Sequence, residues 1–363
     1  MKPIPSLPRP RGGTWPGGIV FDSPVYTASI SASGGAVLAA TERIYRFAPG
    51  AARWQWGETP EGYGDVTCVA VEPRSPGKPR CMVAATFGAL HFFDDEGVRT
   101  QPLPEGYGPE VHEMMWAPRA GGLDPAMCLY LNFGDRALRL LPDDGGPLRH
   151  FEGKFWPRNR DDDEPVAMAS DGDRGVAYAM FDEENWELEV WALTDFETNS
   201  WVGRTVPAPS FFVGARLAVA GTAVAVAFSH VGGVWLTRDL KEQDLVELEP
   251  FREAEGVAEF DRGAVVAFEG ASADAALFVA AQETARRSII ARVDATGGVE
   301  RIAELEVEVE DDEAFGGRLI QQMAWDDTRR TLWCAASHAG VLGSTAPGSP
   351  VPIGKGAVVR AAS

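Results

Sequence analysis

Cysteine is scarce in this chain of 363 residues, which contains only four, at Cys68, Cys81, Cys128 and Cys334. All four lie inside apolar runs, and no two have the close spacing that is typical of a zinc site or a redox-active pair. We expect them to be reduced and buried, as is usual for the cysteines of cytosolic proteins. A disulfide between Cys68 and Cys81 is the alternative.

Long hydrophobic runs are also lacking. No segment approaches the roughly 20 apolar residues that a membrane-spanning helix needs. Residues 1–18 contain one Lys and several Pro and Gly, without the apolar stretch of a secretory signal. We therefore expect a cytoplasmic protein that does not span a membrane.

Positive charge is in short supply, since 33 Lys and Arg stand against 53 Asp and Glu and give a net charge of −20. Such a protein would repel nucleic acids and anionic membranes, so we expect neither as a partner. The basic residues are mostly Arg, and Ala and Gly are abundant. This composition suggests a bacterial source with a GC-rich genome.

What the chain does contain is an internal repeat. The sequence Pro-Glu-Gly-Tyr-Gly occurs at 60–64 and again at 104–108, which is 44 positions later (104 − 60). Each copy leads into an alternating apolar strand. A repeat of about this length that contains several short strands is the signature of β-propeller blades.

An apolar run recurs along the chain and is predicted to be the second strand of each blade. Because the run is continuous rather than alternating, both faces of this strand should be buried, as happens between adjacent blades. The predicted second strands are 36–40, 81–85, 127–131, 176–180, 223–227, 276–280 and 331–335. Third strands are predicted at 44–47, 89–93, 137–141, 188–192, 234–237, 288–293 and 340–343.

The predicted fold class is all-β, a single seven-bladed β-propeller of four-stranded antiparallel blades over 1–363. Six or eight blades are the alternatives. Residues 1–24 should help to close the ring, with 18–21 and 357–360 meeting in one blade, and 240–259 form either one short helix or a long connection. The approximate blade bounds are 25–62, 63–108, 109–165, 166–210, 211–262, 263–318 and 319–363.

Two segments of the predicted repeat resemble known proteins. Residues 84–92 and 325–333 resemble the repeats of bacterial β-propellers of the sialidase-repeat and sensor-propeller kind. The chain departs from the full Asp-box pattern of sialidase-like blades, of which 170–173 is a fragment, and no Trp-Asp dipeptide recurs at blade ends. The resemblance therefore implies a propeller repeat and no single family.

One face of a propeller carries the loops between second and third strands and the loops between blades, and it surrounds the mouth of the central channel, where ligands usually bind. His230 and His338 lie at equivalent places on this face and are read either as metal ligands or a general base, or as ordinary loop residues. The candidates on this face are Glu42, Thr86, Asn132, Asp135, Arg136, 182–184, Ser229, His230, Glu283, Arg286, Ser337 and His338.

Patterns that would indicate catalysis are missing from the sequence. A propeller lactonase needs a ring of Glu, Asp and Asn around a metal, but no Asn lies on a predicted first strand. The sequence has no Gly-x-Ser-x-Gly elbow and no phosphate-binding glycine loop with its Lys. We therefore expect a protein that is not an enzyme and uses neither a cofactor nor a metal.

Tryptophan is frequent, with 11 residues, and several are predicted on outer strands or in loops. Such residues either form binding platforms for carbohydrate or protein, or pack between blades. Those considered are Trp54, Trp56, Trp156, Trp186 and Trp201.

Two acidic runs, at 161–164 and 304–313, are the most unusual feature of the sequence. Both are predicted to connect blades on the channel-mouth face. The run at 304–313 holds seven acidic residues in ten. The two runs are either solvated loops or a binding surface for a partner protein with a basic surface. The partner-binding candidates are Asp161, Asp162, Asp163, Glu164, Glu308, Glu310, Asp311, Asp312 and Glu313.

The function that these observations favour is a non-catalytic scaffold for protein–protein interaction in a bacterial multi-protein assembly. By resemblance, one context is the bacterial gene-cassette propellers that work beside an AAA+ ATPase and a von Willebrand A-type protein. The alternative is a metal-dependent lactonase or a sugar hydrolase that acts at the channel mouth.

Overall fold

The structure is a computed structural model, and all structural statements below concern the residues that it describes. These are 2–3, 27–30, 36–40, 43–47, 55–71, 82–93, 98–103, 105, 108–118, 127–133, 137–141, 149–150, 164–171, 175–182, 185–195, 200–207, 215–228, 234–240, 246–248, 264–284, 287–307, 320–326, 331–336, 340–344, 351–353 and 357–361.

The regular elements of these residues are all β-strands, and each sheet pairs its strands antiparallel, in chain order except for strands near the two ends of the chain. The first sheet contains β2 (Thr27–Ile30), β3 (Ala36–Ala40), β4 (Arg43–Phe47) and β5 (Gln55–Glu58), with β1 (Lys2–Pro3) beside β5. The second sheet contains β6 (Cys68–Val71), β7 (Met82–Thr86), β8 (Ala89–Phe93) and β9 (Val98–Pro102). The third sheet contains β10 (Glu113–Pro118), β11 (Met127–Asn132), β12 (Ala137–Leu141) and β13 (Arg149–His150). The fourth sheet contains β14 (Glu164–Ser170), β15 (Val176–Asp182), β16 (Glu187–Asp195) and β17 (Ser200–Pro207).

The C-terminal part continues this pattern with three further sheets. The first is β18 (Ala215–Ala220), β19 (Ala223–Phe228), β20 (Val234–Thr237) and β21 (Val246–Leu248). The second is β22 (Ala264–Phe268), β23 (Leu277–Thr284), β24 (Arg287–Val293) and β25 (Val299–Val307), extended by β30 (Ala357–Ala361) and β29 (Val351–Ile353). The third is β26 (Ile320–Asp326), β27 (Thr331–Ala336) and β28 (Gly340–Ser344). The prediction of an all-β chain with antiparallel sheets is therefore confirmed for the described residues.

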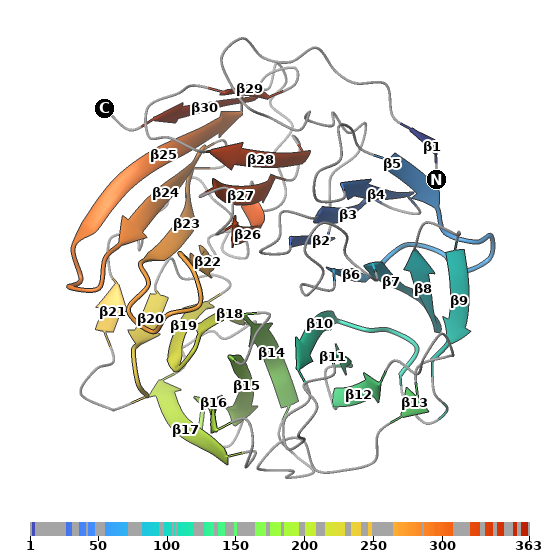
Figure 1. Cartoon of the computed structure of the whole chain (residues 1–363), viewed down its shortest axis with the longest axis horizontal. Helices are drawn as coiled ribbons and strands as arrows, with labels where there is room; N and C mark the ends of the chain where they lie inside the picture. Colours follow the sequence, from blue (N-terminus) through green and yellow to red (C-terminus); the bar gives the residue numbers. More distant parts are fainter. Residues whose placement is uncertain are drawn as a thin grey trace.

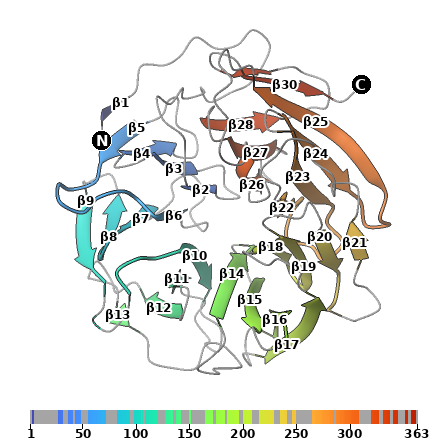
Figure 2. The same ribbon diagram turned by 180° about the vertical axis from the view of Figure 1, so that it is seen from behind.

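The sheets are set around a common centre, with the first strand of each sheet innermost (Figure 1). The view from behind shows the same radial arrangement (Figure 2). Contacts run from β2 to β6, β10, β14, β18, β22 and β26 in turn, and β26 also contacts β2. This arrangement is that of a β-propeller.

The second strands are buried on both faces, as the continuous apolar runs predicted. Ala225 of β19 belongs to a buried cluster with Val279 of β23, in the following sheet. Its neighbour Val226 belongs to a different cluster, with Val190 of β16, in the preceding sheet. Because successive side chains of a strand point to opposite faces, each second strand is packed between two sheets and needs apolar residues at every position.

The antiparallel order gives the propeller two different faces. One carries the turns between second and third strands and the segments that lead into the first strands, and we call it the entry face. The opposite face carries the turns between first and second and between third and fourth strands. On the entry face, the Gly88 N–H of the β7–β8 turn donates to the Pro109 carbonyl, just before β10, at 2.6 Å.

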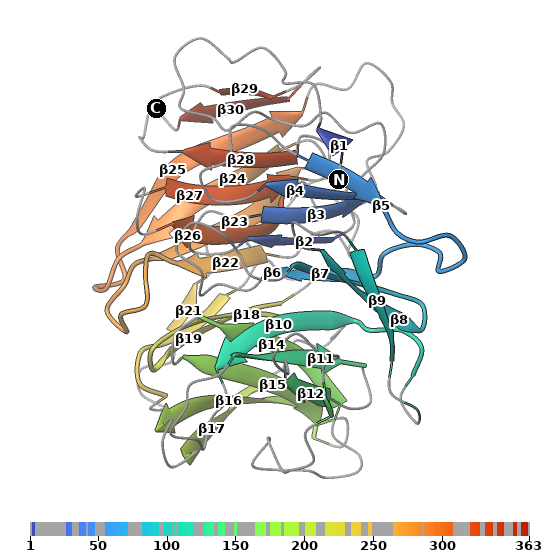
Figure 3. The same ribbon diagram turned by 45° about the vertical axis from the view of Figure 1, so that its right-hand side comes forward.

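Three expectations about the outer parts of the sheets differ from the structure. Strand β30 pairs with β25 and with β29, so 357–360 extend the β22–β25 sheet and do not complete the β26–β28 sheet (Figure 3). Residues 304–307 belong to β25 and are not part of a connecting loop. In the segment 240–259, residues 246–248 form the outer strand β21. Segment 18–21 lies outside the described residues.

The thiols of Cys68 and Cys334 are free and buried, which confirms the expectation of a reduced, buried thiol at these two positions. Cys68 also donates from Sγ to the Val111 carbonyl at 3.3 Å. Burial raises the pKa of the Cys68 thiol well above its ordinary value and that of Cys334 to about 12. The side chains of Cys81 and Cys128 lie outside the described part of the chain.

We expect a thiol reagent to modify Cys68 and Cys334 slowly in the folded protein, because the reactive thiolate is nearly absent and the sulfur atoms are covered. The rate should be measured in a Cys81→Ser, Cys128→Ser variant, so that only these two thiols report. The same variant in denaturant is the control and should react at the rate of a free thiol. Fast modification of both thiols without denaturant would contradict their burial.

Candidate functional site

Most of the acidic residues proposed to bind a partner lie outside the described residues. These are Asp161, Asp162, Asp163, Glu308, Glu310, Asp311, Asp312 and Glu313. Glu164 is described as the first residue of β14, where its backbone is paired with Phe181 of β15. Since β14 is a first strand, Glu164 stands at the entry face, where the sequence predicted it.

The other channel-mouth candidates that are described turn out to serve the fold. Thr86 and Asn132 are buried. The Asp182 carboxylate accepts hydrogen bonds from the backbone N–H and the side-chain amide of Asn185, at 3.1 and 2.9 Å, and so shapes the β15–β16 turn. The candidates that lie outside the described residues, or whose side chains do, are Glu42, Asp135, Arg136, 183–184, Ser229, His230, Glu283, Arg286, Ser337 and His338.

His91 of β8 is fully buried between three strands. Its Nε2 lies 2.8 Å from the Thr86 hydroxyl and its Nδ1 lies 3.0 Å from the Thr100 hydroxyl. The ring of Tyr63 packs edge-on against it, with 5.0 Å between ring centroids. Burial lowers the pKa of His91, so the neutral ring, held by two hydroxyls, is a structural element of the β6–β9 sheet.

Glu113 is the most unusual ionisable residue of the propeller interior. It is the first residue of β10, and its Oε2 accepts a hydrogen bond from the Met168 N–H of β14 at 2.8 Å. Its Oε1 lies 3.6 Å from Nη1 of Arg216 in β18, where the Arg216 side chain is 46% exposed. One carboxylate therefore links the first strands of three successive sheets.

The environment of Glu113 changes its acidity. Its side chain is only 20% exposed, and burial raises its pKa to about 7, although the Arg216 charge and the Met168 N–H act in the opposite direction. At neutral pH the carboxyl is thus divided between its protonated and ionised forms. Chemically, such a group is suited to donate or accept a proton, and structurally it couples β10, β14 and β18.

Sequence reasoning did not single out Glu113. The signal was present, since this Glu opens a first strand whose next four residues, Met-Met-Trp-Ala, are apolar. An acidic side chain at the inner end of such a strand either faces solvent or finds a partner. The partners come from β14 and β18, 55 and 103 residues further along the chain (168 − 113 and 216 − 113), and local sequence cannot indicate them.

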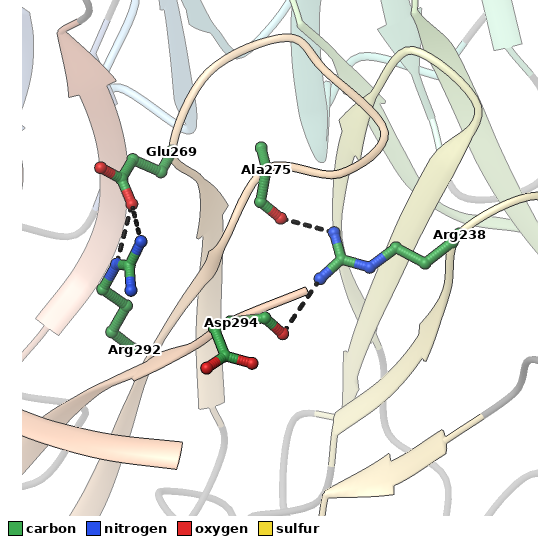
Figure 4. A network of polar contacts seen from close by, with 5 residues as sticks. All are labelled: Arg238, Glu269, Ala275, Arg292 and Asp294. Carbon is green, nitrogen blue, oxygen red and sulfur yellow. Dashed lines mark hydrogen bonds and ion pairs between the residues drawn. The ribbon is translucent and has the colours of Figure 1, made fainter. Parts of the chain in front are cut away.

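The opposite face holds a second polar network, which joins neighbouring sheets (Figure 4). The Arg238 guanidinium, after β20, donates to the carbonyls of Ala273 and Ala275 in the β22–β23 turn and to that of Asp294 after β24. Arg292 and Glu269 form an ion pair with 2.7 Å between Nη2 and Oε2. The guanidinium groups of this network donate to backbone carbonyls and to a carboxylate. We conclude that the network holds neighbouring sheets together.

Asp171 and Asp294 shape turns on this same face. Asp171 accepts from the Gly175 N–H in its own turn at 2.9 Å and from the Gly221 N–H of the next sheet at 3.1 Å. Asp294 accepts from the hydroxyl and N–H of Thr296 and from the Gly298 N–H. These hydrogen bonds, that of the Thr296 hydroxyl first, lower the pKa of Asp294. Both carboxylates are thereby engaged by backbone and hydroxyl donors of turns.

Two of these tryptophans have described side chains, and each packs against another aromatic ring, Trp186 edge-on against Phe181 with 5.1 Å between ring centroids. Trp201 packs edge-on against Tyr178, with 5.4 Å between ring centroids, and so serves packing. Trp186 is 44% exposed on the β15–β16 turn of the entry face and has a φ of 55°, which is rare for a bulky residue. Trp54 and Trp156 lie outside the described residues, as does the side chain of Trp56.

Within the described ranges, no three or more His, Cys, Asp or Glu side chains are grouped so that they could hold a metal ion. The same part of the chain contains no helix with the length and apolar character needed to cross a membrane.

Comparison with known proteins gives the fold. No protein-family model matches the chain, and no curated protein matches its sequence. A chain of a mitotic checkpoint complex is similar in structure, with 13% identity, 94% of this chain and 97% of that chain covered, and a TM-score of 0.56. The Swd1 β-propeller domain of Myceliophteria thermophila has 11% identity, coverage of 90% and 97%, and a TM-score of 0.52.

The surface component PorZ of the type-IX secretion system of Porphyromonas gingivalis is also similar, with 12% identity and a TM-score of 0.53. The match covers 93% of this chain but only 39% of PorZ, so the chain spans well under half the length of that protein. At these identities the similarity shows the fold alone, and that fold is a β-propeller.

Proposed function

We propose that the chain is a seven-bladed β-propeller that acts without catalysis as a scaffold for protein–protein interaction, in the cytoplasm and within a bacterial multi-protein assembly. The contacts that run from β2 round to β26 and back to β2 support the count of seven. An ATPase-linked gene-cassette system is the assembly that the resemblance of the blades suggests. The similar chains from the mitotic checkpoint complex and the type-IX secretion system belong to protein assemblies, which agrees with this role by analogy of fold.

The observation that carries the scaffold role is that the buried polar groups of the described residues bind other strands of the propeller. Glu113 is bonded to Met168 and faces Arg216, and His91 lies between two hydroxyls. These groups join strands to one another. The exposed polar residues of the entry face are instead in loops, where a large partner can reach them.

The partner that we propose is a protein with a basic surface. The net charge of the chain is −20, and the described loops of the entry face expose Glu61, Asp65, Glu105 and Glu110. Asp161, Asp162 and Asp163 precede β14 in the chain, directly before an entry-face position. Charges at the rim of an interface mainly steer the encounter, so they should act on the association rate and be sensitive to salt.

The test is to capture the partner from the native host with the tagged protein and to measure association kinetics with the purified partner. The Asp161→Lys, Asp162→Lys, Asp163→Lys variant should bind with an on-rate about tenfold lower at low salt. The difference should shrink at physiological salt, where charges are screened over about 8 Å. Thermal stability should not change. Equal on-rates at low salt would show that this acidic run is only solvated.

A second function, hydrolysis of a lactone or a glycoside at the channel mouth, is favoured by one observation, the pKa of about 7 for Glu113. A carboxyl with this pKa is suited to general acid–base catalysis, and Arg216 would anchor an anionic substrate group. Hydrolysis of a panel of lactones and glycosides, with and without a divalent metal, tests this role. Activity of the wild type that the Glu113→Gln variant lacks would favour it over the scaffold role.

A further inference from the structure

Phe87 is the most exposed large apolar side chain among the described residues, at 63%. It lies at the tip of the β7–β8 turn on the entry face. The two Pro-Glu-Gly-Tyr-Gly copies lead into β6 and β10, which are the first strands of the sheet that contains this turn and of the sheet after it. Burying a phenyl ring against a partner is favourable, so an exposed phenylalanine at the tip of a turn can serve as an anchor for a partner.

The turn that carries Phe87 is held in place from two sides. The Gly88 N–H donates to the Pro109 carbonyl at 2.6 Å, and the Leu103 N–H donates to the Gly88 carbonyl at 2.9 Å. Gly88 has a φ of 85°, in the region that favours glycine. Below the turn, Thr86 is bound to His91. The ring of Phe87 is therefore presented by a fixed backbone, so that little backbone ordering is needed on binding.

The surroundings of Phe87 are acidic. Glu105 and Glu110 are exposed and lie within two residues of Leu103 and Pro109, which bind the turn. Glu61 and Asp65 are exposed and lie two residues on either side of Tyr63, whose ring packs on His91. The described residues of 59–67 and 103–112 include no Lys or Arg. The charge that complements this surface is positive.

We propose that Phe87, together with the exposed Glu61, Asp65, Glu105 and Glu110 of the loops that contact its hairpin, forms a docking surface for a cationic protein segment in which Arg alternates with apolar residues. The phenyl ring offers apolar contact and a face on which a guanidinium stacks. The carboxylates accept charge-assisted hydrogen bonds from the same Arg residues. This inference rests on the proposed function and names the surface that the basic partner uses.

The test uses the full chain and a fluorescein-labelled peptide in which Arg and Leu alternate, with binding followed by fluorescence anisotropy at low salt. The Phe87→Ala variant should bind this peptide about tenfold or more weakly, because a central aromatic anchor is lost. The Glu105→Gln, Glu110→Gln variant should bind more weakly and with a smaller dependence on salt. The matched control is Val299→Ser, since Val299 is 46% exposed on the opposite face, and it should leave the affinity unchanged.

A peptide in which Glu and Leu alternate should not bind, since only the cationic peptide complements the surface. A contrary result would be that Phe87→Ala binds the Arg–Leu peptide as tightly as the wild type does, while the Asp161→Lys, Asp162→Lys, Asp163→Lys variant binds it more weakly. That result would exclude the Phe87 surface and would still support a partner with a basic surface. If the wild type binds neither peptide at low salt, both the surface and the basic partner are overturned. Circular dichroism of Phe87→Ala should match the wild type, and the Glu105→Gln, Glu110→Gln variant tests the same surface without altering the turn.

Discussion

The Leu131→Ala variant should lose about 2–5 kcal/mol of unfolding free energy, the usual cost of removing a leucine side chain from a core that cannot fully collapse. Leu131 of β11 is fully buried. It shares a cluster with Leu90 and Phe92 of β8, so its side chain fills space between two sheets. Both sheets belong to a ring, and neither can close the cavity without disturbing its other neighbour.

Equilibrium unfolding in urea, followed by tryptophan fluorescence, measures this loss. The matched control is Val98→Ala on β9, where the side chain is 43% exposed, and its unfolding free energy should stay within about 0.5 kcal/mol of the wild type. A loss of less than about 1 kcal/mol in Leu131→Ala would mean that the interface between these sheets is not tightly packed.

The Glu113→Gln variant should remove a pH dependence from the stability of the protein. The pKa of Glu113 rises from 4.5 to about 7 on folding, so the folded protein binds more protons than the unfolded chain between these pH values. Its contribution to stability is therefore full below pH 4.5 and is lost as the pH rises through 7. A change from 4.5 to about 7 corresponds to about 3 kcal/mol.

Unfolding free energies of wild type and Glu113→Gln, measured from pH 4 to pH 8, give this contribution as their difference. The difference should move by about 3 kcal/mol in favour of the variant as the pH rises. Glu187→Gln, an exposed residue with the same change of charge, is the control and should follow the wild-type profile. A constant difference between wild type and Glu113→Gln would contradict the raised pKa.

The strand pattern could be predicted because the burial of a strand determines which of its own residues are apolar. A second strand such as 223–228, Ala-Val-Ala-Val-Ala-Phe, is apolar at every position since its two faces pack in separate clusters. The third strands were predicted from their place after a short polar break that follows each second strand, and the observed β8, β12 and β20 coincide with 89–93, 137–141 and 234–237.

The outer edges were predicted less well. Strand β30 pairs with β25 and not with β28, although 357–361 reads as an ordinary apolar strand. Strand β30 lies between β25 and β29, and its apolar residues indicate a strand but not the sheet that it joins. In residues 304–307, acidic residues alternate with apolar ones. The high acidic content led to the prediction of a connecting loop, whereas these residues belong to β25, which lies between β24 and β30.

By itself, the sequence determined the all-β class, the recurring units and the position of most second and third strands, because hydrophobic periodicity is a local property that follows from burial. Only the tertiary structure decided which polar residues meet. Glu113 finds its partners Met168 and Arg216 on strands far along the chain, and the turn of Phe87 is fixed by Leu103 and Pro109 of the next connecting segment. Such contacts depend on how sheets pack around the ring, which involves residues that no local pattern relates to one another.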